Sequence, residues 1–427
     1  MCPPPSGRPQ SNLERRLAVW FLMALVWGTA AITVEGRVLT LAGKPLTAFV
    51  WMAQAALAGL ALAFSTRKKI TFPIAVWLPW LFWIVIRCNF TDFVCVQRTA
   101  MLWAGPIAGM GASVVISNPD ELSWLIRSLR VIVVICLTIY AMTILHVLPL
   151  GVRFSGCSLM TLCLAASLLA PYVLAGNRRD TILWLSCLAM CTLEAFRITI
   201  GTCILTLPLT PSRQSPKKRL MAVIVVGFLG IAVLSVPQVR DKMLSYSGHD
   251  SLRELVRSPG DTYSSGRFAM WRLYMSEAWE RPLLGHGGST AYAFGMEIAG
   301  WDHPHSDYIR VFFEYGIIGL ILLGIPFLYT LLLAYRQIRV TQSAILRDAW
   351  TVSCGGFISM ALLAVTDNVI LYIAFFGCLL FGLFGGACGA STGENRVRPE
   401  GPVPPERPGL SEHHREAHTW AQQRGSS

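Results

Sequence analysis

Hydrophobic residues in this chain gather into long runs, and polar residues lie mostly in the stretches between them. A helix that crosses a bilayer needs about 20 predominantly apolar residues, and most of the runs come close to that length. They predict an all-α fold: a polytopic helical membrane protein with about twelve transmembrane helices and one large periplasmic loop between late spans. The predicted spans are residues 17–34, 46–64, 70–86, 99–116, 131–148, 156–175, 181–195, 197–211, 218–236, 309–334, 348–366 and 369–390.

The composition agrees with a membrane protein, because 54% of the 427 residues are hydrophobic and only 14% are charged. A soluble globular protein has about 25% charged residues. The net charge of +12 would suit a nucleic-acid-binding protein, but the basic residues lie between hydrophobic segments. Their expected role is to set the topology. The expected partners therefore include membrane lipids and exclude nucleic acid.

The distribution of basic residues predicts the orientation. With the N-terminus in the cytoplasm, the cytoplasmic segments before the tail hold 17 lysines and arginines, and the short loops on the other side hold five. This excess satisfies the positive-inside rule. Residues 181–211 fit either one long span or a hairpin of two short ones, and the hairpin is favoured because it keeps both flanking basic clusters inside.

This topology divides the chain into four parts. Residues 1–236 form an N-terminal transmembrane bundle, 237–308 a periplasmic loop and 309–390 the C-terminal transmembrane helices. Residues 391–427 are rich in Pro, Glu and Arg, which predicts a disordered cytoplasmic tail. The twelve cysteines show no zinc-type spacing, so no disulfide framework, metal or cofactor is expected.

Ionisable residues cluster in "WDHPHSDYIRVFFEYGIIGL", residues 301–320, where the last long polar stretch meets a hydrophobic run. Pro304 suits the first position of a helix. A helix from Pro304 would place Asp307, Arg310 and Glu314 on one solvated or salt-bridged face. It would place His305 on the opposite, apolar face. His305 is then either a packed histidine or a functional group at the membrane boundary.

The segment 262–289 precedes this cluster and predicts a second helix, capped by Ser264 or Ser265. Arg267, Trp271 and Tyr274 would share one face of it. An arginine among aromatic residues either lies along the surface or holds a phosphate with its guanidinium group. "GHGGS" (285–289) predicts a tight turn, and it lacks the Lys-Ser/Thr pair and the preceding strand of a nucleotide-binding loop.

A third candidate is Arg197, which follows Glu194 near the outer tip of the predicted hairpin. Charges within spans are costly and usually face a cavity or a partner. The two residues form either an internal structural pair or part of the same outer interface as Arg267 and His305.

These motifs in their order resemble the O-antigen ligase and polysaccharide polymerase superfamily of bacterial inner membranes. The resemblance covers residues 264–320 and extends to the number of spans. The earlier S-R-G motif of that family reads "FRI" here, so only Arg197 corresponds to it, and the familiar Asn after the histidine is Ser306. The corresponding residues are Arg267, Trp271, Pro282, Leu283, Gly285, Gly287, His305, Ser306, Tyr308, Glu314, Gly316 and Gly319.

The resemblance implies transfer of a glycan from undecaprenyl diphosphate to an acceptor hydroxyl at the periplasmic face, without a metal or a nucleotide sugar. The acceptor would be a glycan or a glycolipid such as lipid A-core. The implied catalytic residues are His305 as base, with Arg267 and Arg197 at the diphosphate. The implied substrate-binding residues are Trp271, Tyr274, Gly285, Gly287, Tyr308 and Arg310.

Three alternatives stay open. A Wzy-type polymerase would use the same donor and extend a repeat-unit chain, and the motifs do not separate it from the favoured ligase. A transporter of lipid-linked sugars is disfavoured, because the polar cluster lies in an outer loop rather than near the bilayer midplane. A structural scaffold gives no reason for the arrangement of Arg267 and His305.

Overall fold

The computed structural model describes residues 12–33, 40–41, 44–66, 69–144, 156–193, 197–211, 216–237, 239, 241, 267–300, 303–369 and 373–397. The regular elements among these residues are helices, apart from a short antiparallel hairpin of β1 (Thr40–Leu41) and β2 (Lys44–Pro45). The helices are α1 (Asn12–Thr33), α2 (Leu46–Phe64), α3 (Ile74–Ile86), α4 (Phe93–Val115), α5 (Pro119–Ile144), α6 (Gly156–Leu174), α7 (Arg178–Leu193), α8 (Arg197–Leu209), α9 (Pro216–Leu234), α12 (Arg267–Ala278), α13 (Thr290–Ala299), α14 (Asp307–Val340), α15 (Ala344–Ala364) and α16 (Ile373–Val397).

The predicted all-helical fold is confirmed, and each of the twelve predicted spans overlaps one of these helices. Among the described residues, α5 over Pro119–Met142 and α14 are long and apolar enough to cross a membrane by themselves. Several of the other helices hold shorter apolar segments. The count of twelve membrane crossings and the periplasmic loop stay predictions. Residues 242–266 of that loop and 398–427 of the tail lie outside the described residues.

The largest difference in helix bounds concerns α5, which begins at Pro119 rather than near residue 131. Its first turn carries Asp120 and Glu121, as the positive end of a helix dipole favours. Hydropathy detects only the apolar part of a helix and misses such a polar beginning. Arg130, which the sequence suggested for a loop, therefore lies within α5, where its Nε donates to Asp180 of α7 at 2.6 Å.

The predicted hairpin of residues 181–211 corresponds to two helices, α7 and α8, which pack against each other and against α6. Residues 194–196 between them, with the suggested Glu194 partner of Arg197, lie outside the described residues.

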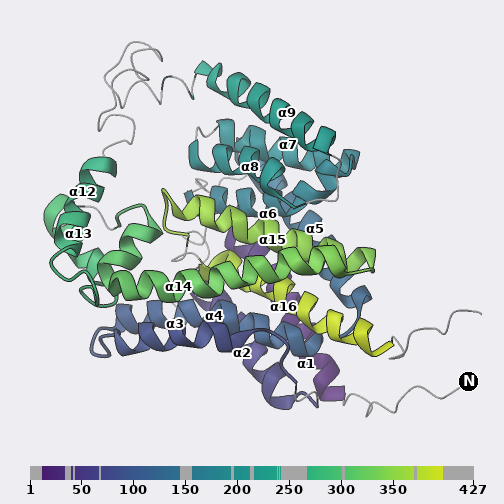
Figure 1. The fold of residues 1–427 in the computed structure, drawn as a ribbon, viewed down its shortest axis with the longest axis horizontal. Helices are drawn as coiled ribbons and strands as arrows, with labels where there is room; N and C mark the ends of the chain where they lie inside the picture. The colour runs from purple at the N-terminus through teal and green to yellow at the C-terminus, as the bar shows by residue number, and fades with distance from the viewer. Residues whose placement is uncertain are drawn as a thin grey trace, which may run out of the picture.

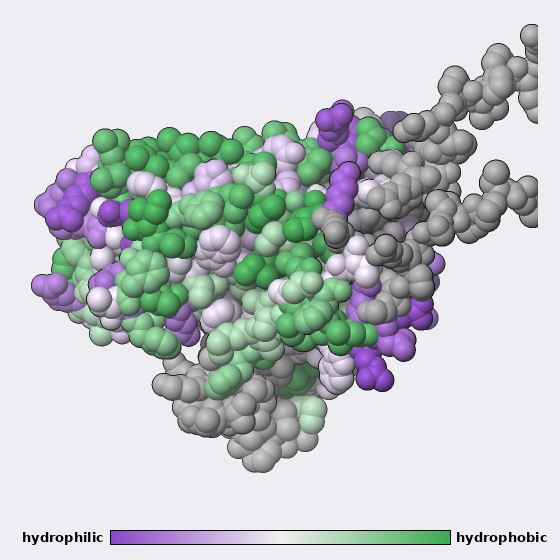
Figure 2. Space-filling model, turned by 90° about the horizontal axis from the view of Figure 1, so that it is seen from below, coloured by the Kyte–Doolittle hydropathy of each residue, from purple (hydrophilic) through white to green (hydrophobic). Residues whose placement is uncertain are grey.

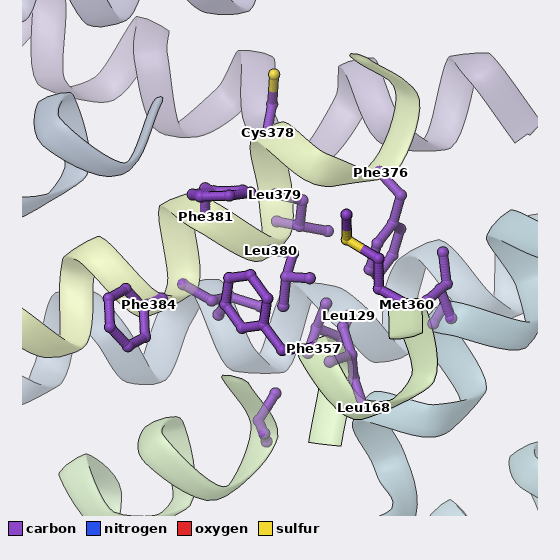
Figure 3. Packing of buried hydrophobic residues seen from close by; sticks show 14 of the residues in the cluster. Leu129, Leu168, Phe357, Met360, Phe376, Cys378, Leu379, Leu380, Phe381 and Phe384 are labelled. Carbon is purple, nitrogen blue, oxygen red and sulfur yellow. The ribbon is translucent and has the colours of Figure 1, made fainter. Parts of the chain in front are cut away.

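Helix α16 lies in the core of the bundle, where its buried Phe381 and Phe384 meet Phe357 of α15 edge to face (Figure 3). The same helix also packs closely on α4. Small residues permit this approach, as is common between membrane helices: a Cβ on Gly385 would overlap the carbonyl of Gly109. This packing builds a rigid support for the elements at one end of the bundle.

The two ends of the bundle differ. Helices α12 and α13 lie at one end, beside the beginning of α14, whereas α1 begins and α16 ends at the opposite end (Figure 1). A broad apolar surface separates hydrophilic residues at the two ends (Figure 2). This distribution suits a chain whose middle lies in a bilayer. The candidate site is at the end that carries α12.

Candidate active site at the end of the bundle

Three segments meet at this end: α12, the turn at residues 303–306, and residues 366–368 after α15. Trp271 of α12 donates its indole N–H to the carbonyl of Pro304 at 2.7 Å. Arg267 of the same helix donates Nη1–H to the carbonyl of Thr366 at 2.8 Å. The two side chains lie one turn apart on α12, so a single face of this helix contacts both the turn at residues 303–306 and residues 366–368. The structure thus brings Arg267, Trp271 and the turn that carries His305 together, as the sequence suggested.

Arg267 is partly buried, and burial lowers the pKa of its guanidinium group, with the carboxylate of Asp367 acting in the opposite direction. A guanidinium group stays protonated in proteins and carries five N–H donors. The contact with Thr366 fixes the orientation of the Arg267 cation, which lies near the carboxylate of Asp367. Such a fixed cation can stabilise negative charge that develops on a neighbouring group.

His305 does not lie in a helix, which corrects the prediction that one begins at Pro304. Helix α14 begins at Asp307, and Ser306 before it has an extended backbone. His305 has φ 50°, in the left-handed region that non-glycine residues seldom adopt. Its side chain is 31% exposed, so the turn presents the imidazole at the surface of the site rather than to the apolar interior. His303 also precedes the helix, and its ring lies near Tyr292.

Asp367 is a site residue that the sequence reasoning missed. Its Oδ1 lies 3.8 Å from Nδ1 of His305, and its side chain is 6% exposed. Its backbone carbonyl accepts the N–H of Asp307 at 3.2 Å, so it also holds the first turn of α14. Oδ1 accepts the backbone N–H of Asn368 at 2.9 Å, which fixes the carboxylate. A carboxylate beside one ring nitrogen can orient an imidazole so that the other nitrogen faces a substrate.

The predicted solvated stripe on α14 is buried. Asp307, Arg310 and Glu314 have exposed fractions of 1%, 4% and 0%. The predicted salt bridge does form, with Nε of Arg310 donating to Oε1 of Glu314 at 3.1 Å. A helical period cannot distinguish a solvated polar face from a buried polar layer. Arg310 is thus enclosed and paired with Glu314, and its contact with a substrate stays a prediction.

Backbone contacts explain the two glycine motifs. The turn at Pro282–Gly288 lies on a bend in α14: the N–H of Gly287 donates to Glu314, and the N–H of Ile317 donates to Pro282, each at 2.8 Å. A Cβ on Gly285 would lie 2.5 Å from the carbonyl carbon of Glu314, and one on Gly316 would overlap the carbonyl of Leu283. Both glycines have positive φ, which favours glycine. Gly285 and Gly287 therefore support the site through their backbone.

The two tyrosines proposed to bind substrate differ in placement. Tyr274 is 1% exposed, donates its hydroxyl to Ala291 at 2.7 Å, and packs between Phe294 and Phe313. It holds α12 and α13 on α14 rather than facing the site. Tyr308 is 42% exposed and donates its hydroxyl to the carbonyl of Ala361 at 3.1 Å, which leaves its ring at the surface between α14 and α15.

Arg197 lies elsewhere in the bundle. It is the first residue of α8 and lines a hollow between α8 and α9, together with Ile200, Gly230 and Val233. Among the described residues, the lining of this hollow includes neither Arg267 nor His305. This hollow therefore does not join Arg197 to the other two predicted catalytic residues, and the role of Arg197 rests on the resemblance alone.

The arrangement agrees with the comparison to known families. Residues 181–324 match the family described as O-antigen ligase. This match supports the O-antigen ligase and polymerase superfamily that the sequence motifs suggest. The matched part includes Arg197, Arg267 and His305 and ends before Asp367. No curated protein matches the chain.

The family match implies an enzyme of the glycosyltransferase kind, with lipid-linked glycan and acceptor substrates in general. It also indicates a place in polysaccharide biosynthesis at the bacterial inner membrane. The match itself bears out the resemblance drawn from the sequence motifs.

Proposed function

We propose that this O-antigen ligase family member transfers a glycan from undecaprenyl diphosphate to an acceptor hydroxyl, of lipid A-core or a similar glycolipid, at the periplasmic face. The observation that carries the proposal is the convergence of Arg267, His305 and Asp367 on adjacent turns at one end of the bundle. A cation, an imidazole and a carboxylate at a membrane boundary suit a donor whose leaving group is an anionic lipid.

In the proposed reaction, the acceptor oxygen attacks the anomeric carbon of the donor sugar, and the bond from that carbon to the diphosphate oxygen breaks. The imidazole of His305 takes the proton of the attacking hydroxyl, while Asp367 orients the ring. The bonding electrons leave with the lipid diphosphate, whose growing negative charge Arg267 stabilises. Trp271 positions the histidine through Pro304. None of these steps requires a metal.

Reconstitution tests the function directly. Purified protein in lipid nanodiscs, given a glycan on undecaprenyl diphosphate and a lipid A-core acceptor, should produce a glycosylated acceptor visible on a gel. The same donor without the acceptor should stay unchanged. Extension of the donor glycan without lipid A-core would instead establish the polymerase alternative. Donor that is carried across the membrane but not consumed would indicate a transporter.

The topology gives a separate prediction, which rests on the excess of basic residues on one side. A reporter that works only in the periplasm should be active when fused at Gly248, and a cytoplasmic reporter should be active at Gly401. Both positions lie in long polar segments, so the fusions should disturb the bundle little. Cytoplasmic activity at Gly248 would place Arg267 and His305 on the wrong side and contradict the mechanism.

A further inference from the structure

A hollow between α14 and α15 runs from the candidate site along the apolar part of the bundle. It has a volume of about 300 Å³. On α14, residues spaced three or four positions apart from Leu320 to Leu331 line the hollow. The hollow therefore follows one continuous face of this helix. Met360, Ala361 and Ala364 of α15 line its other wall. With the exception of Tyr308, the described lining is apolar.

The hollow opens on the outer surface of the bundle. Leu328, one of its lining residues, is 57% exposed, and Ile321, Ile325 and Leu332 beside it on α14 are more than half exposed. Large apolar patches on a protein surface mark a binding site or a membrane contact. A chain that lies in the bilayer can therefore enter this hollow from the side.

One end of the hollow coincides with the polar site. Tyr308 lines it and lies three residues after His305. Ala364 lines the other wall and lies two residues before Thr366, whose carbonyl holds Arg267. The apolar hollow thus begins beside the segments that carry the histidine and hold the cation. A charged site that adjoins an apolar hollow fits a molecule with an anionic head and a long hydrocarbon tail.

Gly324 provides the room for such a tail. It lies in the middle of the lining, and a Cβ added there would meet no atom within 4 Å. A volume of about 300 Å³ is at the small end of ligand pockets, which hold roughly 300–1,000 Å³. The hollow is therefore large enough for only the first part of a long chain, and the remainder would lie in the bilayer.

We propose that the α14–α15 hollow binds the head-proximal part of the polyprenyl tail of the lipid diphosphate donor and so places its diphosphate beside Arg267. This inference rests on the proposed function, because it takes the donor class from it. Tyr308 forms the boundary between tail and head group: its ring contacts the first isoprene units, and its hydroxyl stays on Ala361.

Gly324→Leu tests the tail site, because leucine fills the hollow without a backbone conflict. Overfilling an occupied groove should raise the KM for a donor with a full-length tail about tenfold. The KM for the acceptor should stay unchanged. A donor with a two-isoprene tail, too short to reach Gly324, should be used equally by the variant and the wild-type protein. Gly59→Leu is the matched control, because that glycine also faces open space but lies on α2.

Two results would overturn the tail site. The first is an unchanged KM for the long-tailed donor in Gly324→Leu. The second is a selective increase in Gly230→Leu, which would place the tail in the hollow between α8 and α9 that begins at Arg197.

A crosslinking experiment separates the tail site from the transfer reaction. A polyprenyl diphosphate with a photoreactive group on its third isoprene unit should label α14 and α15 peptides of the wild-type protein in nanodiscs. Unlabelled polyprenyl diphosphate should compete, whereas the phospholipid of the nanodisc should not. If no glycan is transferred but this labelling persists, the proposed function fails and the lipid site stands. Labelling that phospholipid abolishes would show an ordinary bilayer contact and overturn the site.

Discussion

His305→Ala is expected to reduce glycan transfer by about 10²–10⁴-fold, the usual contribution of a general base. The imidazole is the titratable ring that the turn before α14 presents to the site, and Asp367 lies beside its Nδ1. The variant should reach the membrane at the wild-type level, because a side chain that is 31% exposed contributes little to the packing of the bundle. The measurement is the initial rate of acceptor glycosylation by purified protein at equal concentration.

His303→Ala is the matched control for this experiment. The residue lies in the same turn, two positions before His305, and should lower the rate much less. Asp367→Asn should give an intermediate loss, because the amide keeps the shape of the carboxylate but not its charge. An active His305→Ala together with an inactive His303→Ala would show that the motif has been aligned on the wrong histidine. Full activity in both would leave the chemistry to the arginines.

Most of the fold could be predicted from the sequence because membrane helices carry their signal locally. An apolar run must satisfy its own backbone hydrogen bonds in lipid, and a helix does so within the run. For this reason the predicted span 46–64 and the helix α2 have the same bounds. The prediction failed where a helix continues into a polar region, as in the first turns of α5, because no apolar signal marks that part.

The site could be predicted only where its residues lie in one local motif. Arg267 and Trp271 share a helix face that periodicity identifies, and in the structure Trp271 contacts the turn that holds His305 while Arg267 contacts Thr366 beside it in the site. The helix start was misplaced because Pro304 suits a first helical position, whereas the backbone of His305 is left-handed and α14 begins two residues later. Trp271 and Asp367 hold Pro304 and Asp307 on either side of this residue, and local sequence does not encode such contacts.

Asp367 shows that a contact between residues far apart in the chain could not be predicted from the sequence. It lies 62 residues after His305 in the chain, at the end of α15, in a segment that reads as the end of a span. Only the packing of α15 on α14 brings it to the histidine. The sequence offered one usable signal, which is a pair of polar residues, Asp367 and Asn368, between two apolar runs. Buried polar residues of this kind at a span boundary commonly mark a functional site.

Arg267→Ala is expected to reduce transfer by about 10²–10³-fold, which is typical for the loss of one fixed donor to a developing negative charge. Arg272→Ala is the matched control, because this arginine lies on the same helix, is exposed, and should leave the rate almost unchanged. The rate is measured with the same purified components as for His305, together with thermal unfolding to confirm that α12 keeps its place.

Arg267→Lys separates a directed donor from a plain positive charge, and it should fail almost as completely as Arg267→Ala. In the structure one N–H of the planar guanidinium group holds the carbonyl of Thr366, and the remaining edge can donate to a diphosphate in a fixed direction. A lysine ammonium group is a single compact charge and cannot keep both contacts in the same geometry. Wild-type activity in Arg267→Lys, at equal protein level, would show that the site needs only a cation at this boundary. Equal activity in Arg267→Ala would reduce Arg267 to an anchor of α12 on the end of α15.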